Sequence, residues 1–133
     1  MTIIDEQQLV IVRRRDCEWC GHKGPSEPAH ISARGHGAGR RLDVGWNLVA
    51  LCAPFANACH HRSHNNGRPN FEDLKALAAK RAGVSINDWE EALFAVQRLP
   101  NRSPQRLIEA ELAGLPDGAR RLVQQVLDAR RAA

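Results

Sequence analysis

Residues 46–64 read WNLVALCAPFANACHHRSH, and this stretch decides the fold of the first half of the chain. The apolar run 46–51 is predicted to form a β-strand, because it is bulky and too short for an isolated helix. From Ala58 the pattern becomes helical, and His60 and His64 then lie one turn apart on the same face. A strand followed by a helix that presents two imidazoles is therefore expected.

The residues before this stretch indicate two further short strands and two loops. Residues 28–32 are predicted to form a strand that carries His30, and the glycines of 34–41 favour a flexible loop after it. An earlier β-run is predicted over 9–13. The glycines and the proline of 21–25 supply the tight turns that a metal-binding knuckle needs.

Four cysteines occur as two separated pairs, which are Cys17 with Cys20 and Cys52 with Cys59. Asp5 and Glu6 interrupt the apolar residues at the start, so we expect no secretory signal, a reducing cytoplasm and a bound metal rather than disulfides. Four thiolates suit a tetrahedral structural Zn²⁺. Two alternatives stay open: His22 or His61 replaces one cysteine, or the cysteines are reduced and bind nothing.

The order of these polar positions resembles the signature of HNH nucleases. Residues 27–31 (EPAHI) carry His30, residues 46–52 (WNLVALC) carry Asn47, and His60 follows Cys59. The resemblance covers residues 15–66 and is closest to small zinc-containing HNH proteins of phages and prophages. It implies an α+β fold, with a ββα-metal (His-Me) finger and a zinc knuckle over 1–70 and a helical C-terminal extension over 71–133.

The resemblance also implies a metal-dependent DNA endonuclease that nicks DNA or cleaves both strands. In that family the residue at His30 accepts a proton from the attacking water, and His60 and His64 hold a catalytic Mg²⁺, Mn²⁺, Ni²⁺ or Zn²⁺. Asn47 supports the base or its loop, although a turn residue before a strand is the ordinary explanation of such an asparagine. The resemblance thus gives His30, Asn47 and His60 catalytic roles and predicts a second metal besides the zinc.

Two positions depart from the family pattern. Many members carry Asp or His as a third metal ligand directly before the base, whereas this chain has Ala29. Glu27 shares the strand face of Ala29 and is a candidate substitute. The spacing between Cys52 and Cys59 is also longer than the family usually has, which makes the geometry of the zinc site an open question.

The formal net charge of +4 favours a polyanionic partner. Arginines are interleaved with the motif, and those predicted to contact nucleic acid are Arg34, Arg40, Arg41 and Arg62. DNA is the expected substrate, with RNA left open.

The alternative from another class is a zinc-stabilised DNA- or protein-binding module that has lost turnover. The chain has neither a GxxxxGK[ST] loop nor a GxSxG elbow, so these rival enzyme classes lack support.

The second half is predicted to form helices with readable starts and stops. Asn70 and Ser85 are expected to cap the first two, Ser103-Pro104 opens a third, and the last begins near Asp117. We expect these helices to complete the hydrophobic core. Three other roles stay open: formation of a homodimer, binding of phage packaging or recombination proteins, and contacts with DNA. The arginines considered for those contacts are Arg120, Arg121, Arg130 and Arg131. No membrane span is expected.

Overall fold

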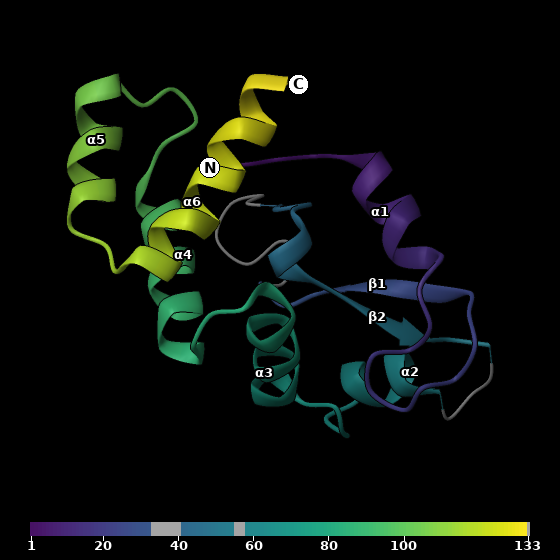
Figure 1. Cartoon of the computed structure of the whole chain (residues 1–133). Helices are drawn as coiled ribbons and strands as arrows, with labels where there is room; N and C mark the ends of the chain where they lie inside the picture. The colour runs from purple at the N-terminus through teal and green to yellow at the C-terminus, as the bar shows by residue number, and fades with distance from the viewer. Residues whose placement is uncertain (33–40, 55–57, 133) are drawn as a thin grey trace.

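The computed structural model describes residues 1–32, 41–54 and 58–132. Within these ranges it contains six α-helices, a short 3₁₀ turn and one two-stranded antiparallel sheet (Figure 1). The expected α+β class is confirmed. None of the helices in the described ranges is long and apolar enough to cross a lipid bilayer.

The sheet joins β1 (Ser26–His30) to β2 (Leu48–Cys52), with His30 opposite Leu48 and Ser26 opposite Cys52. The predicted strand at 28–32 is therefore present but begins and ends earlier. The run predicted as a strand from 46 opens instead as a 3₁₀ turn, η1 (Gly45–Asn47). Successive residues of a strand face opposite sides, so Glu27 and Ala29, two positions apart in β1, share a face.

The β-run predicted over 9–13 is wrong, because these residues belong to helix α1 (Glu6–Arg13). The Asp5 side chain caps this helix by accepting from the backbone N–H groups of the next turn. Leu9 and Val12 lie three positions apart, and both are buried against Leu48 and Ala50 of β2. A short apolar run fits either helix or strand, and here the cap and this packing decide for the helix.

Helix α2 (Cys59–His64) follows β2 at the position expected from the sequence. Figure 1 shows α1 on one side of the two strands and α2 on the other. The order β1, β2, α2 therefore places the two predicted histidines beside a hairpin that carries a third.

The remaining helices are α3 (Phe71–Ala82), α4 (Ile86–Arg98), α5 (Gln105–Ala113) and α6 (Asp117–Ala132). Asn70 and Asp73 form a reciprocal capping box at the start of α3, and Ser85 caps α4. Gly83 ends α3 with a left-handed φ of 72°, which glycine adopts at little cost. The predicted starts of α3 and α4 at Asn70 and Ser85 are confirmed.

The helices of residues 71–133 share one hydrophobic core with the first half. Trp46 of η1 and Trp89 of α4 meet edge to face with ring centroids 5.7 Å apart. The Trp46 indole donates to the Leu122 carbonyl oxygen of α6 at 3.0 Å. The expected core completion is thus present, while the boundary at residue 70 stays a prediction.

Two of the arginines considered for DNA contacts bind backbone carbonyl oxygens of the protein, and their contacts with DNA stay predictions. Arg120 donates to Leu112 and Leu115, and Arg121 donates to Ala82 at the end of α3. Leu112 and Ala82 lie in the last turns of α5 and α3, where carbonyl oxygens have no N–H donor further along the same helix.

Candidate functional site

A pocket of about 430 Å³ brings together the three histidines that the sequence singled out. Its walls come from α1, β1 and α2, and its lining residues are Leu9, Arg13, Glu27, Pro28, His30, His60 and His64. Ala29 is buried in the core and does not line it. Residues far apart in the sequence therefore line one concave site that contains several ionisable side chains.

His30 is held by a buried aspartate that the sequence analysis missed. Its Nε2 lies 2.7 Å from Oδ1 of Asp43, and the two side chains are 9% and 0% exposed. Asp43 also accepts from the Arg41 guanidinium and from the backbone N–H of Asp5. One signal in the sequence could have revealed it: Asp43 stands between apolar Leu42 and Val44, in the segment that links His30 to Asn47, which indicates a buried carboxylate near the motif.

The environment of Asp43 keeps its carboxylate ionised. Burial alone would raise its pKa, but hydrogen bonds from Arg41, His30 and Asp5 outweigh burial and hold the pKa below the ordinary value. An ionised carboxylate only accepts, so Nε2 of His30 carries a hydrogen and Nδ1 of the neutral ring keeps a lone pair. His30 is thereby fixed in the tautomer that offers Nδ1 as a proton acceptor.

Asn47 is fully buried and joins the two ends of the segment that follows His30. Its Oδ1 accepts from the Ser32 N–H at 2.9 Å, and its Nδ2 donates to the Leu42 carbonyl oxygen at 3.0 Å. These bonds tie the end of β1 to the residue before Asp43. The geometry suits the support role that the sequence predicted for Asn47.

His60 and His64 are paired across one turn of α2. Their Nε2 atoms lie 2.9 Å apart. Two nitrogen ligands held about 2.1 Å from one ion at a right angle lie about 3.0 Å apart, so the pair fits neighbouring positions of an octahedral divalent cation. Burial and the neighbouring His64 lower the pKa of His60, which favours the neutral imidazole that binds metals.

The four cysteines form the second candidate site. Their Sγ atoms all lie within 4.8 Å of one another, and Cys20 and Cys52 are 3.7 Å apart. Sulfurs about 2.3 Å from a tetrahedral zinc lie about 3.8 Å from each other, so this donor set fits Zn²⁺. The long spacing between Cys52 and Cys59 does close, and neither His22 nor His61 belongs to the group.

The surroundings act differently on the four sulfurs, lowering the pKa of Cys17 and raising those of Cys52 and Cys59. The N–H of Cys20 donates to Cys17, the N–H of Cys59 donates to Cys52, and Arg62 donates to the Cys59 sulfur at 3.3 Å. Burial opposes ionisation of Cys17, yet backbone N–H groups lower its pKa to about 7. Burial raises the pKa of Cys59 to about 12, against the effect of Arg62. Zinc binding would therefore release protons from this cluster.

Among the described residues, the four cysteines form the one group of three or more His, Cys, Asp or Glu side chains that lie close enough together to hold a metal ion. His60 and His64 form a pair without such a third donor among the described residues. The further ligands of an ion held there would be water or substrate oxygen.

The arginines predicted to contact nucleic acid have mixed outcomes. Arg34 and Arg40 lie outside the described residues. The guanidinium of Arg41 binds Asp43 and Glu6, and that of Arg62 faces the cysteine cluster. Both side chains therefore have partners within the protein. Their contacts with DNA stay predictions.

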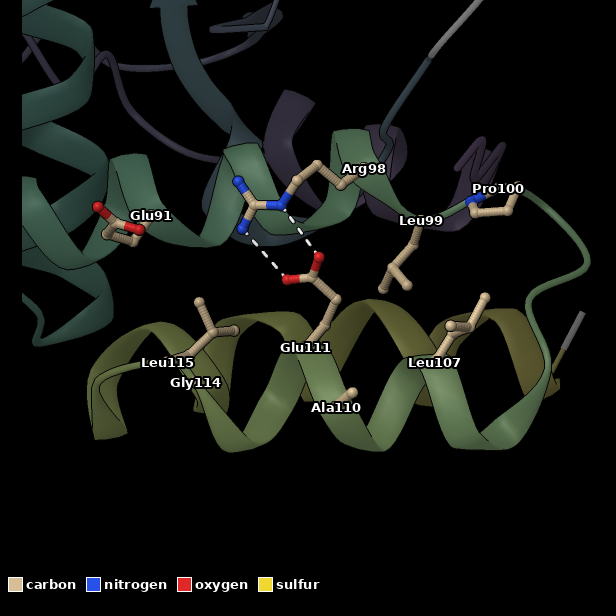
Figure 2. Close-up of a pocket in the computed structure, with 9 residues that line it drawn as sticks. All are labelled: Glu91, Arg98, Leu99, Pro100, Leu107, Ala110, Glu111, Gly114 and Leu115. Atoms are coloured by element: carbon tan, nitrogen blue, oxygen red, sulfur yellow. Dashed lines mark hydrogen bonds and ion pairs between the residues drawn. The ribbon is translucent and has the colours of Figure 1, made fainter.

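A second pocket of about 480 Å³ lies between α4 and α5 (Figure 2). Figure 2 shows Arg98 and Glu111 paired across it through two parallel hydrogen bonds, 3.0 and 3.1 Å long. Its other lining residues are mainly apolar, and no histidine or cysteine is among them. The pocket offers no hydrolytic chemistry comparable with that of the histidine pocket.

The chain matches no protein-family model, no curated protein and no solved structure at a significant level. A functional conclusion therefore has to come from the histidine pocket and the cysteine cluster themselves.

Proposed function

We propose that the protein is a divalent-metal-dependent DNA endonuclease of the HNH type, in which β1, β2 and α2 form the ββα-metal finger. The observation that carries the proposal is the convergence of His30, His60 and His64 on one pocket. His30 is held there by an ionised aspartate, and the other two are spaced for one ion. A general base and an open metal site side by side are the parts that phosphodiester hydrolysis requires.

In the proposed reaction, Nδ1 of His30 takes a proton from water while the water oxygen attacks phosphorus. The bond from phosphorus to the 3′ oxygen breaks, which leaves a 5′ phosphate and a 3′ hydroxyl once that oxygen gains a proton from solvent. The charge that develops on His30 lies beside the Asp43 carboxylate, which stabilises it. Asn47 keeps the two segments in register.

A divalent cation bound by His60 and His64 would neutralise charge on the phosphate and on the departing oxygen. Mg²⁺, Mn²⁺, Ni²⁺ and Zn²⁺ are all candidates. The chain contributes two neutral imidazoles on a single helical turn, and it leaves the remaining coordination positions to oxygen ligands.

The cysteine cluster would hold a structural zinc that does not react. It joins the turn before β1 to the end of β2 and to the first residue of α2. Since Cys59 directly precedes His60, the zinc would also fix where α2 begins and so where its two histidines lie. The DNA substrate, the cytoplasmic location and the phage setting belong to this proposal.

The alternative is a zinc-stabilised binding module without turnover. The absence of a close third donor beside His60 and His64, within the described residues, is the observation that favours it. The two functions differ in their metal requirement, because an enzyme needs a labile divalent ion in addition to tightly held zinc.

Cleavage of supercoiled plasmid by the zinc-loaded protein tests the proposal. The assay compares Mg²⁺, Mn²⁺ and Ni²⁺ with EDTA, and the variant His30→Ala controls for contaminating nuclease. Metal-dependent nicking that disappears in the variant is the expected result. Folded, zinc-loaded protein that cleaves nothing with any of these metals would instead favour the binding module.

A further inference from the structure

Helix α1, which lies outside the ββα unit, forms one wall of the histidine pocket. Leu9 and Arg13 are one helical turn apart, and both line the pocket. Leu9 and Val12 pack on β2, so the end of α1 is anchored to the hairpin. The backbone position of Arg13 beside the hairpin is therefore set by the fold.

Most described arginines near the hairpin are engaged in close contacts. Arg41 binds Asp43, Arg62 binds the Cys59 sulfur, and Arg81 binds Glu18. Arg13 differs, because its contact among the described residues is a single long ion pair with Glu27. Its Nε lies 3.9 Å from Oε2 of Glu27, and the two side chains are 47% and 49% exposed.

An exposed ion pair of this length contributes little stability. A phosphate that enters the pocket can offer two oxygens to two parallel N–H groups of the guanidinium, which is a closer contact than the 3.9 Å pair with Glu27. Glu27 lines the same pocket, and its charge acts on His60. An incoming phosphodiester would therefore meet one cation ready to bind it and one carboxylate that repels it.

We propose that Arg13 binds the substrate phosphate in this pocket and that Glu27 is its counter-ion in the free protein, displaced when the phosphodiester enters. This inference rests on the proposed endonuclease function. It gives a substrate-binding role to a residue outside the recognised motif, and it makes Glu27 a competitor of the substrate rather than a metal ligand.

The kinetic test compares Arg13→Ala with Arg14→Ala. Arg14 is the next residue, carries the same charge and does not line the pocket, so it is the matched control. Loss of one charge-assisted contact predicts a fall in kcat/KM of about 10- to 100-fold for Arg13→Ala and about 2-fold or less for Arg14→Ala. Arg13→Lys should recover part of the loss. Equal losses in the two alanine variants would overturn the inference.

A binding test separates this inference from the proposed activity. Fluorescence anisotropy of a labelled short DNA duplex is measured with Mn²⁺ on proteins that carry His30→Ala, so that no cleavage occurs. Adding Arg13→Ala should weaken binding, and adding Glu27→Gln should strengthen it. Circular dichroism and zinc content confirm that each variant is folded.

The outcomes distinguish the two claims. If the wild-type protein cleaves nothing but Arg13→Ala selectively weakens binding of the duplex, the endonuclease proposal fails, and Arg13 keeps its role as a phosphate-binding residue of a DNA-binding protein. If the wild-type protein cleaves and Arg13→Ala binds like Arg14→Ala, the inference fails alone. Loss of Mn²⁺ binding in Glu27→Gln, measured by calorimetry, would identify Glu27 as a metal ligand and overturn its role as counter-ion.

Discussion

The Trp89 indole N–H donates a 2.6 Å hydrogen bond to the carbonyl oxygen of Trp46, the residue immediately before Asn47. Trp89 is fully buried in α4, and Trp46 bonds in turn to α6. The helices of the second half therefore hold the turn from which the buried asparagine reaches both ends of the segment after His30.

Replacing Trp89 is expected to loosen this support. Trp89→Ala should lower the free energy of unfolding by about 3–5 kcal/mol, because a large buried ring is lost. Trp89→Phe keeps much of the ring but removes the donor, and should cost about 1–3 kcal/mol. Urea unfolding followed by circular dichroism gives both values. A phenylalanine variant as stable as the wild type would show that the hydrogen bond to Trp46 contributes nothing.

The aspartate behind His30 should matter for the rate rather than for substrate binding. Asp43→Asn removes the charge that stabilises the protonated base and permits the wrong tautomer, so kcat should fall by about 10²- to 10⁴-fold with little change in KM. Plasmid cleavage under saturating metal measures both constants. A variant with unchanged kcat would remove Asp43 from the proposed mechanism.

The same aspartate predicts how stability depends on pH. Its pKa is lower in the folded protein than in the unfolded chain, so its stabilising effect is present above the ordinary aspartate pKa of about 4 and is lost as pH falls through the folded value. The wild type should therefore lose stability more steeply than Asp43→Asn below about pH 4. Thermal melts of both proteins from neutral to acidic pH measure the difference, and parallel curves would contradict it.

Metal analysis should separate the two candidate metal sites. Cys52→Ser is expected to lose zinc and to melt well below the wild type, since zinc binding contributes directly to folding. His64→Ala should keep zinc and fold, but should bind Ni²⁺ or Mn²⁺ more weakly. Elemental analysis after dialysis and calorimetric titration measure the two properties. Zinc loss from both variants would mean that the sites are not independent.

The local signals in the sequence were sufficient for much of this structure. The capping residues at Asn70 and Ser85 gave the starts of α3 and α4, and the i, i+4 spacing of His60 and His64 predicted that their rings lie together on one face of α2. The convergence of the four cysteines also followed from their pairing, although only the folded chain shows that the long spacing closes.

What the sequence did not reveal depends on contacts between distant segments. The short apolar run of α1 fits two periodicities, and its burial against Leu48 and Ala50 is visible only in the fold. The sequence does not indicate which side chain Asp43 contacts, and its pairing with His30 at 2.7 Å is visible only in the fold. The sequence alone does not indicate that Arg13 lies near the histidines, because this depends on how α1 packs beside the hairpin.

The bond from Trp46 to Leu122 has a consequence for the order of assembly during translation. All four cysteines precede α3 in the sequence, so they emerge from the ribosome before α3 does, and an unfinished chain could bind zinc. Trp46 gains its partner only after α6 has emerged. In the proposed enzyme, a nascent chain could thus hold zinc while the turn that carries Asn47 still lacks its hydrogen bond to α6, and the support of His30 would be completed last.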